Sequence, residues 1–361
     1  MKALVSNAVG SGFDLEDVDL AAPVGHEVLV DVRASGLCHT DLTIANHGLF
    51  PTPSVLGHEV AGVVAAVGPD VRQLRLGDHV VASLTQSCGA CDRCLSGRPF
   101  QCRHPEATLR GPTDAPRLSR NGAPLHQGFG LAGFAERVLV HENQLAVVPA
   151  AVPFAQAALL GCGVVTGAGS VLNTAVVRAG DSVVIIGAGG VGLNAVSGAR
   201  IVGASRIVVI DINDARLAQA RHFGATQVIN SATTNAVEAV RDLVPGGADH
   251  VFDFVGMTAA TESGLEMLGV GGGLYLVGVA RPDAEIRLNV MGAVTGQKRV
   301  QGVTYGSSNF KRDIPMYAEL YLQGRMNLDD LVSKQIALRD VNDGYAALAD
   351  GTLTRVVVTS F

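Results

Sequence analysis

The chain falls into two parts that differ in their pattern of apolar and polar positions. Residues 1 to about 150 are short alternating segments broken by Gly and Pro, such as VLVDVRA, VAGVVAAVG, HVVASL and AERVLV. This pattern predicts a β-rich unit with antiparallel strands. From about 180, continuous apolar segments such as SVVIIG and RIVVID alternate with helical segments such as VGLNAVSGARIVGA and DARLAQARHFGA. Such alternation predicts βαβ units and a parallel sheet, and therefore an α/β fold.

Two stretches follow neither of these patterns. Residues 103–128 are polar and rich in Pro, without periodicity. A loop of this length in a compact domain is more often functional or interface-forming than idle. After about 305 the chain leaves the βαβ pattern, passes through the amphipathic segment IPMYAELYLQGRM and ends in the predicted strand TRVVVTS.

Composition and net charge indicate which classes of protein the chain can belong to. The 361 residues are 48% hydrophobic and 17% charged, which is a folded composition long enough for two domains. The net charge is −6 and Lys and Arg form no cluster, so we expect no nucleic-acid partner. The first twenty residues carry no apolar run of the signal-peptide kind, and longer apolar runs are interrupted by Gly. We therefore expect a cytoplasmic protein without a membrane partner.

A glycine-rich turn follows the first strand of the βαβ region. GAGGVG supplies Gly187, Gly189 and Gly192 in a GxGxxG pattern between a buried strand and a helix. In that context the first Gly makes the tight turn, the second lets a pyrophosphate approach, and the third allows close packing of helix on strand. The helix N-terminus offers N–H groups to the phosphates. The turn therefore predicts a dinucleotide site.

Asp211 ends the next strand, 19 residues beyond Gly192. A carboxylate there accepts hydrogen bonds from the ribose hydroxyls and repels a 2′-phosphate, which favours NAD over NADP. The alternative is that Asp211 only caps the following helix. Arg216 lies on that helix and is predicted beside the adenosine or, alternatively, as a solvated residue.

Four of the six cysteines lie within fifteen residues, in the run CGACDRCLSGRPFQC, at Cys88, Cys91, Cys94 and Cys102. In a reducing compartment close-set thiols are more often metal ligands than disulfides. Four thiolates can surround one tetrahedral Zn²⁺ and leave no open position, which is a structural site. An iron–sulfur cluster is the competing interpretation.

The other two cysteines are Cys38, in GLCHTD, and Cys162, in LLGCGVVTG, with His58 between them in GHEVAG. One His and two Cys from separated segments would leave the fourth zinc position open, as in catalytic sites. Spacing alone equally allows two small buried thiols and a core histidine with satisfied hydrogen bonds.

The segment GHE-x2-G-x5-G-x2-V resembles the signature of zinc-containing alcohol dehydrogenases of the medium-chain dehydrogenase/reductase family. It is carried by Gly57, His58, Glu59, Gly62, Gly68 and Val71. The thiol run, the Cys162 segment and the glycine-rich turn follow in that family's order, so the resemblance covers essentially the whole chain. It implies a β-rich GroES-like catalytic domain at 1–163 and 305–361, with a structural zinc lobe at 88–102. A doubly wound Rossmann NAD-binding domain is implied at 164–304.

The resemblance also implies roles for individual residues. Cys38, His58 and Cys162 would hold a catalytic zinc, Glu59 would lie behind it as an exchangeable ligand, and Asp41 would orient the zinc histidine. Thr40 would accept the alcohol proton, but the relatives' final His is replaced by Thr43, which cannot act as a base near neutral pH. His47 or water could end the relay instead.

Cofactor and substrate positions are implied in the same way. The expected NAD contacts are His39, Thr166, Gly187, Gly189, Gly190, Val191, Gly192, Asp211, Arg216, Val279 and Arg355, the last as a phosphate-binding arginine. The expected pocket residues are Thr40, Leu49, Leu84 and Phe129, with Phe50 and Gly128 nearby. Because these side chains are mostly apolar and Gly128 replaces a bulkier residue, we expect a medium-chain, terpenoid or aromatic alcohol. A homodimer joined through the strand at about 299–304 is implied as well.

Two rival functions remain open at this point. The first is a thiol-dependent formaldehyde dehydrogenase or an alcohol oxidoreductase that holds NAD(H) tightly. It needs cationic residues at the pocket mouth, for which Arg110, Arg117 and Arg120 are candidates. The second is a zinc-stabilised protein without activity, which would have no need for zinc ligands, Thr40 and the NAD turn together.

Overall fold

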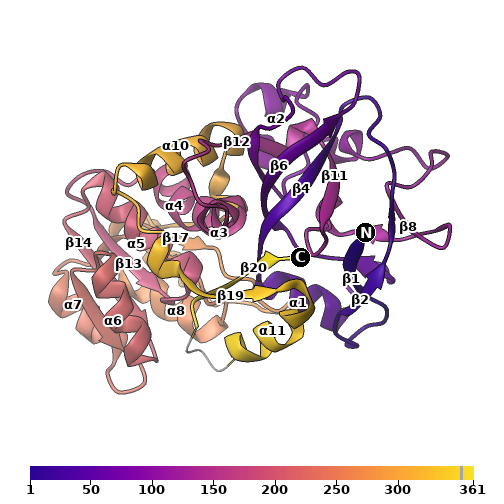
Figure 1. Ribbon diagram of the computed structural model, residues 1–361. Coiled ribbons are helices and arrows are strands. Elements are labelled where there is room, and N and C mark those ends of the chain that lie inside the picture. The colour runs from indigo at the N-terminus through magenta and orange to yellow at the C-terminus, as the bar shows by residue number, and fades with distance from the viewer. Residues whose placement is uncertain (350–352) are drawn as a thin grey trace. The chain divides into compact units, whose positions relative to one another are not determined.

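The computed structural model describes residues 1–349 and 353–361, and these form two compact units. The first unit contains Met1–Cys162 and Asn309–Phe361, and the second contains Gly163–Ser308. The strand-rich first part of the chain and the βαβ part lie in different compact units, and the C-terminal segment belongs to the first (Figure 1).

The first unit is built on a seven-stranded sheet that joins the two ends of the chain. Its order is β12-β7-β6-β4-β20-β19, and β11 pairs with β4. These strands are Leu145–Val147, His79–Ala82, Glu59–Val67, Glu27–Gly36, Arg355–Ser360, Val332–Ala337 and Arg137–His141. Because β4 pairs antiparallel with both β6 and β20, the last strand lies close to the GHE segment at the start of β6.

Two smaller sheets complete the strands of this unit. One has the order β10-β5-β1-β2, from His126–Gln127, Ser54–Val55, Lys2–Ser6 and Asp14–Asp17. The other has the order β3-β8-β9, from Asp19–Leu20, Leu118–Arg120 and Ala123–Pro124. The helices of the unit are α1 His39–His47, α2 Asp92–Leu95, α3 Phe154–Leu159, α10 Phe310–Leu322 and α11 Val341–Ala349.

The excursion at 103–128 has more regular structure than the sequence analysis predicted. It contains β8, β9 and β10, and β8 and β9 pair as a hairpin. Asn121 and Gly122 connect them with φ of 51° and 79°. Asn-Gly is the preferred dipeptide for a turn with two positive φ values, so the signal for this hairpin was present in the sequence. Strands of two or three residues are too short to produce a visible alternation.

The second unit contains one fully parallel sheet of the order β15-β14-β13-β16-β17-β18. The strands are Gln227–Asn230, Arg206–Asp211, Ser182–Ile186, Ala248–Asp253, Leu268–Leu276 and Arg299–Gly302. Numbered along the chain this order is 3-2-1-4-5-6, the doubly wound Rossmann topology. The helices are α4 Val165–Gly169, α5 Gly190–Val202, α6 Asp214–Phe223, α7 Ala236–Leu243, α8 Thr258–Met267 and α9 Val290–Thr295.

The continuous apolar run of β13 is explained by its burial, since all five of its residues are buried in the middle of the sheet. Its neighbours Val208 and Val251 are also fully buried, and each such side chain stabilises the fold by about 1.5–3 kcal/mol. One stretch, Phe154–Ala175, is long and apolar enough to cross a membrane, but 83% of its apolar window is buried. This is the burial expected of a core helix in a soluble protein.

Candidate metal and cofactor sites

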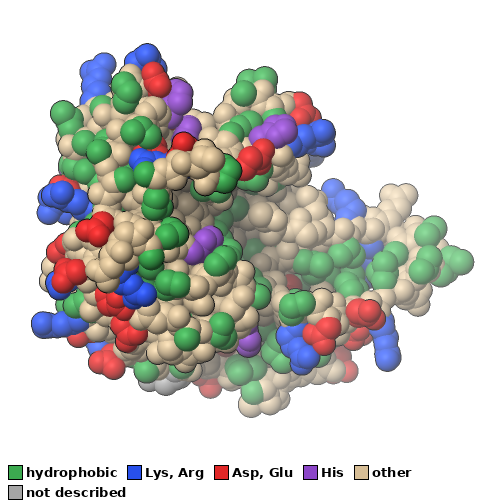
Figure 2. Space-filling view, turned by 90° about the vertical axis from the view of Figure 1, so that its right-hand side faces the viewer, with side chains coloured by type: hydrophobic (Ala, Val, Ile, Leu, Met, Phe, Trp, Pro, Cys, Tyr) green, Lys and Arg blue, Asp and Glu red, His purple; other side chains and the backbone are tan. Residues whose placement is uncertain are grey.

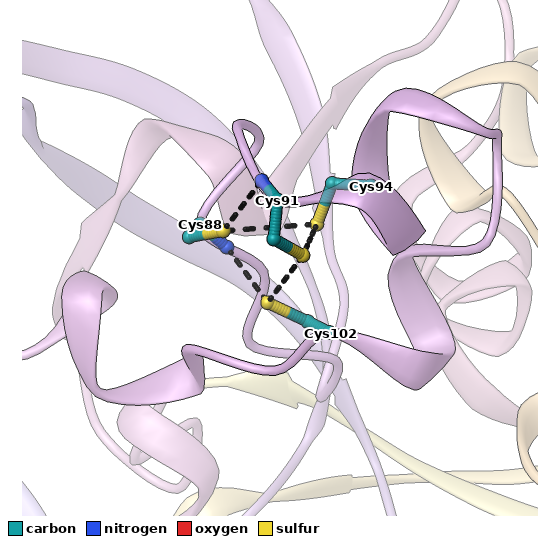
Figure 3. Close-up of side chains that lie close together, drawn as sticks. All are labelled: Cys88, Cys91, Cys94 and Cys102. Atoms are coloured by element: carbon teal, nitrogen blue, oxygen red, sulfur yellow. Dashed lines mark hydrogen bonds between the residues drawn. The ribbon is translucent and has the colours of Figure 1, made fainter.

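The four clustered thiols converge on one point. Cys88 lies in the loop after β7. Cys91 is the N-cap of the short helix α2, and Cys94 lies within that helix. Cys102 directly follows a 3-10 turn at Pro99–Gln101 (Figure 3). The Sγ of Cys91 lies 3.6 Å from that of Cys94 and 3.9 Å from that of Cys102, and the Sγ atoms of Cys88 and Cys94 are 3.9 Å apart. A tetrahedron with Zn–S bonds of about 2.3 Å has edges of about 3.8 Å.

These distances decide between the metal interpretations. A disulfide requires an S–S distance of about 2.05 Å, and all six cysteines are free. An iron–sulfur cluster distributes its thiolates over several irons, which holds the sulfurs farther apart than these are. The spacing fits a single tetrahedral ion, for which four thiolates are the typical ligands of structural zinc.

The protonation of the thiols also fits a cation. Hydrogen bonds from the backbone N–H groups of Arg103 and Cys94 lower the pKa of the Cys91 thiol to about 6. Burial raises the pKa of the Cys94 thiol to about 12. Four thiolates therefore cannot coexist here at neutral pH unless a cation lies between them.

A second group of side chains that could bind a metal lies in the interior of the first unit. Atoms of Cys38, His58, Glu59 and Cys162 all lie within 4.8 Å of one another. Cys38 is the N-cap of α1, His58 and Glu59 stand at the start of β6, and Cys162 lies in the π-helical turn Leu160–Val164 after α3. A π turn inside a helix is often found at functional sites, because it redirects one side chain.

His58 is oriented for ligation by Asp41. Its Nδ1 lies 2.9 Å from Oδ2 of Asp41, and Oδ1 of Asp41 accepts a hydrogen bond of 3.1 Å from the Gly57 N–H. Burial alone would lower the pKa of His58, but the charges of Asp41 and Cys38 outweigh it and raise the pKa well above its usual value. His58 is fully buried, and neither ring nitrogen makes a hydrogen bond of good geometry within the described part of the chain, although Nδ1 faces the Asp41 carboxylate as an ion pair. A core histidine with satisfied hydrogen bonds would not leave Nε2 in this state.

The pKa shifts of the two thiols in this group also suit the binding of a cation. A hydrogen bond from the Cys162 thiol lowers the pKa of Cys38 well below its usual value. The same contact and burial raise the pKa of Cys162 well above its own. One proton is thus shared between two sulfurs, and a bound cation would favour the thiolate form of both. The donors, two thiols, an imidazole nitrogen and a carboxylate, suit zinc.

Glu59 has a partner that the sequence analysis did not foresee. Its Oε1 lies 3.2 Å from Nη1 of Arg355, the first residue of β20, and Arg355 is only 6% exposed. Burial raises the pKa of Glu59 to about 7 although Arg355 opposes the shift. A Cβ atom at Gly36 would lie 2.2 Å from Oε2 of Glu59, so only Gly at that position leaves room for the carboxylate. Contact between Arg355 and a cofactor phosphate stays a prediction.

The residues expected in the proton relay lie on one side of α1. Thr40 and Thr43 are separated by three positions and Thr43 and His47 by four, so the three share a helix face. Thr40 and Thr43 are half-buried, and His47 and His39 are exposed. Of the expected pocket residues, Leu84 and Phe129 are half-buried and Leu49 is 59% exposed.

The three arginines suggested for a thiol adduct are all engaged within the chain. Glu27 accepts hydrogen bonds from Arg110 at 2.6 and 2.8 Å and from Arg117 at 2.7 Å, and its side chain is 5% exposed. Arg120 pairs with Glu16. These pairs tie the 103–128 excursion to the rest of the unit. The sequence pattern could not show this, because the partners are 83 to 104 positions apart along the chain.

We expect Glu27→Gln to lower the free energy of unfolding by about 3 kcal/mol at pH 7, because two arginines would lose their buried counter-charge. Burial would raise the pKa of Glu27 from 4.5, but Arg110 and Arg117 lower it to about 2. The stabilisation is therefore complete above about pH 4.5 and is lost as the pH falls toward 2. Urea unfolding between pH 2.5 and 7 measures it. The control Glu16→Gln, in a partly exposed pair, should cost less than about 1 kcal/mol; equal losses would contradict the prediction.

The glycine-rich turn of the second unit has the geometry of a dinucleotide site. Gly187 has φ of 99°, and a Cβ at Gly192 would lie 1.9 Å from the Gly187 carbonyl oxygen, so a side chain cannot fit there. The space in front of Gly189, the N-cap of α5, is open for 4 Å, and no side chain caps the helix. Gly190 and Val191 are partly exposed beside it. The N–H groups of the first turn are thus available to a pyrophosphate.

Asp211 is not the cap of the following helix. Asn213 takes that role by accepting hydrogen bonds from the N–H groups of Ala215 and Arg216. Asp211 accepts 2.8 Å and 3.0 Å hydrogen bonds from the N–H groups of Ala188 and Asn213, which fixes it at the end of β14 beside the glycine-rich turn. Of the other predicted cofactor contacts in this unit, Thr166 and Arg216 are half-buried and Val279 is 77% exposed.

Comparisons with known proteins cover nearly the whole chain. Residues 25–150 match the alcohol dehydrogenase GroES-like domain, and residues 190–320 match the zinc-binding dehydrogenase domain. The chain is 35% identical to an S-(hydroxymethyl)glutathione dehydrogenase of Paracoccus denitrificans, over 99% of both chains. It is 36% identical to an NDMA-dependent alcohol dehydrogenase of Amycolatopsis methanolica, over 99% of this chain and 98% of the other. The crystal structure of benzyl alcohol dehydrogenase from Acinetobacter calcoaceticus matches with a TM-score of 0.93 and 34% identity, covering 100% and 99% of the chains.

Proposed function

Because this chain belongs to the zinc-dependent alcohol dehydrogenases of the medium-chain dehydrogenase/reductase family, we propose that it oxidises a primary or secondary alcohol with NAD⁺, or reduces the corresponding carbonyl compound. The observation that carries this proposal is the convergence of Cys38, His58 and Cys162 on one point, where His58 is fully buried and neither of its ring nitrogens makes a hydrogen bond of good geometry within the described residues. The same chain carries a complete dinucleotide turn.

Each residue contributes one part of the chemistry. When bound, zinc supplies Lewis-acid chemistry that lowers the pKa of an alcohol. Asp41 keeps Nδ1 of His58 occupied and so reserves Nε2 as the ligand atom. Thr40 accepts the alcohol proton and passes it along the face of α1 that Thr43 and His47 share. Hydride transfer to the nicotinamide is the cofactor's own reaction, for which the protein supplies alignment.

The alcohol itself is proposed to be medium-chain, terpenoid or aromatic rather than ethanol. Phe129 packs on the ring of His58 and Phe50 packs on Phe129, while Leu84 is a partly buried apolar side chain, and apolar walls favour larger apolar substrates. The test is NADH formation by zinc-replete protein across ethanol, hexan-1-ol, geraniol and benzyl alcohol. Catalytic efficiency should rise with alcohol size, and a maximum at ethanol would refute the proposal.

A second candidate function is supported by the relatives' names. Several are S-(hydroxymethyl)glutathione dehydrogenases, and one is NDMA-dependent. Activity with formaldehyde only after glutathione is added would establish the first of these. Turnover of alcohols only with an artificial electron acceptor, in protein that carries its own nicotinamide, would establish a tightly bound cofactor.

We expect Asp211→Ser to raise the ratio of kcat/KM for NADP⁺ over that for NAD⁺ by about 10- to 100-fold, because the repulsion of a 2′-phosphate is removed. Initial rates with both cofactors at one alcohol concentration measure the ratio. Asp214→Ser removes the same charge from the exposed first turn of α6 and is the matched control. If the control changes the ratio as much as Asp211→Ser, net charge and not ribose recognition sets the preference.

The protein is further proposed to be a cytoplasmic homodimer. Strand β18 is at the edge of the parallel sheet and all four of its residues are exposed. On α9, which precedes it, Val290, Met291 and Val294 are 66–71% exposed. An open edge beside apolar side chains favours pairing with a second copy around a two-fold axis. Light scattering should give twice the chain mass of 37.2 kDa, and the mass of a single chain would refute the dimer.

A further inference from the structure

A small cavity, here called the edge cavity, lies where the end of the seven-stranded sheet meets helix α10. Strand β12 ends the sheet, and α10 packs against it. The cavity has a volume of about 200 Å³ and is lined by Gln73, Leu74, Leu145–Val147, Lys311 and Pro315. Leu74 and Leu145 are buried, whereas Val147 is 42% exposed, so the cavity extends from the core of the first unit to its surface.

Lys311 brings an amine into the edge cavity from the first turn of α10. Its Nζ donates a 3.4 Å hydrogen bond to Oε1 of Gln73, and its side chain is half-buried. Because Asn309 is the N-cap of α10, Lys311 is the second helical residue, where the aligned peptide dipoles disfavour a positive charge. Burial acts in the same direction and lowers the pKa of Lys311, although Glu142 opposes the shift. The amine is therefore more readily neutral than that of an ordinary lysine.

The charged groups around Lys311 are engaged with one another. Oε1 of Glu142 lies 2.6 Å from Nδ1 of His26. The neighbouring Arg312 pairs with Asp313 on α10 itself. Lys311 forms no ion pair with any residue that the structure describes. The ammonium form of Lys311 thus lacks the close carboxylate that a half-buried lysine usually has.

The other three lysines of the chain have different surroundings. Lys2 forms a 2.8 Å ion pair with an aspartate, and Lys298 donates a 3.0 Å hydrogen bond to a backbone carbonyl. Lys334 also lines a cavity, of about 440 Å³, but it is exposed and shares that cavity with two aspartates, whose charges attract an ammonium ion. Lys311 is thus the lysine whose surroundings favour a neutral, nucleophilic amine.

The lining and the charges of the edge cavity indicate a short, uncharged electrophile. Its walls are apolar apart from Gln73 and Lys311, and the charge of Glu142, which acts on Lys311, repels an anion. Burial lowers the pKa of His141 to about 4, so that ring is neutral at pH 7 and attracts no anion. On the face of the molecule in Figure 2, Lys and Arg side chains are likewise scattered among Asp and Glu. A cavity of 200 Å³ is smaller than the pockets of drug-sized ligands and suits a chain of a few carbons.

We propose that Lys311 is a carbonyl-reactive site that captures short, uncharged aliphatic aldehydes as an imine. The lone pair of Nζ adds to the carbonyl carbon and forms the C–N bond. The nitrogen gives one proton to the carbonyl oxygen, and its second proton leaves with that oxygen as water. One amine and one aldehyde thus give one imine and one water, without oxidation or reduction.

The site is separate from the proposed alcohol oxidation. The residues that line the edge cavity are different from the metal ligands, the expected NAD contacts and the expected pocket residues. The two are related in chemistry, because oxidation of a primary alcohol yields an aldehyde. The edge cavity would therefore take up the class of compound that the proposed reaction releases.

Reductive trapping tests the proposal. Wild type, Lys311→Arg and Lys334→Arg would be incubated at pH 7.5 with butanal and sodium cyanoborohydride, which converts an imine into a stable butylamine, and peptide mass mapping would locate the label. We expect Lys311 to carry at least about fivefold more label than Lys334, since each unit by which a pKa falls gives about tenfold more free amine. Lys311→Arg should lose this label, and the matched control Lys334→Arg should keep it.

A charged aldehyde provides the second arm. Glyoxylate replaces butanal, and free Nα-acetyl-lysine in the same mixture corrects for the different reactivities of the two aldehydes. The preference for butanal should be at least about threefold larger at Lys311 than at the free amino acid, because Glu142 repels the carboxylate.

Equal labelling of Lys311 and Lys334 would overturn the proposal, and so would an equal preference at Lys311 and at the free amino acid. Both results come from wild type, so the test does not depend on the folding of a variant. Trapping requires neither zinc nor hydride transfer. Absence of turnover with all alcohols would therefore refute the proposed function and leave this inference standing.

Discussion

Cys162→Ser is expected to abolish alcohol oxidation while the protein remains folded. The variant should contain one zinc ion per chain instead of two, and its kcat/KM should fall at least about 1,000-fold. The reason is that Cys162 supplies one of only two sulfurs in the buried ligand group, and the Lewis acid it helps to hold contributes several kcal/mol to the barrier reduction. Metal analysis by mass spectrometry and NADH formation measure the two effects on one preparation.

The melting temperature of Cys162→Ser separates loss of chemistry from loss of structure. Cys162 lies in a π turn whose backbone is held by neighbouring helical hydrogen bonds, and serine has nearly the same volume. We therefore expect a shift of only a few degrees. Retention of two zinc ions with full activity would show that Cys162 is a buried thiol without a metal role. A large loss of stability would show that the group is structural.

Cys102→Ser is expected to produce the opposite pattern. This variant should also lose one zinc ion, but its main effect should be on stability, with the free energy of unfolding lowered by at least about 3 kcal/mol. The segment 88–102 consists of turns and the four-residue helix α2, and Pro99 is its one buried residue, so the four sulfurs are its principal cross-link. Without the ion, the sulfurs take up protons, and the cross-link that holds them 3.6–3.9 Å apart is lost.

Limited proteolysis and urea unfolding measure this effect. Cleavage should begin within residues 88–102 in Cys102→Ser and remain slow there in Cys162→Ser, which is the matched control because it also removes one sulfur and one zinc. Activity per folded molecule of Cys102→Ser should stay within about tenfold of wild type. If Cys102→Ser loses activity as completely as Cys162→Ser without losing stability, the two metal roles have been exchanged.

Local patterns in the sequence predicted the parts of this fold that depend on neighbours along the chain. The apolar runs of β13 and β14 and the glycine-rich turn between β13 and α5 are such cases, because backbone geometry over a few residues dictates the residue types. The thiol run is another, since four ligands of one tetrahedral ion can come from fifteen residues. The resemblance then placed Cys38, His58 and Cys162 together, which spacing alone did not.

Features that depend on distant pairing could not be read from the sequence. Arg355 meets Glu59 only because β4 pairs with both β6 and β20, which brings together residues 296 positions apart. The arginines of the 103–128 excursion look free in the sequence, yet Glu27 and Glu16 neutralise them. The left-handed conformation of Phe129 gives no sequence signal, since aromatic residues rarely adopt it.

Transfer of deuterium from a dideuterated alcohol to the nicotinamide ring tests the central claim most directly. Zinc-replete protein would be mixed with [1,1-²H₂]benzyl alcohol and NAD⁺. Mass spectrometry would then measure the mass of the nicotinamide cofactor, both the free cofactor and any that denaturation releases from the protein. The account predicts reduced nicotinamide that is one mass unit heavier in wild type and none in Cys162→Ser. Unlabelled cofactor from protein that contains two zinc ions and bound nicotinamide would contradict it, because the proposed hydride transfer from alcohol to NAD⁺ would not occur.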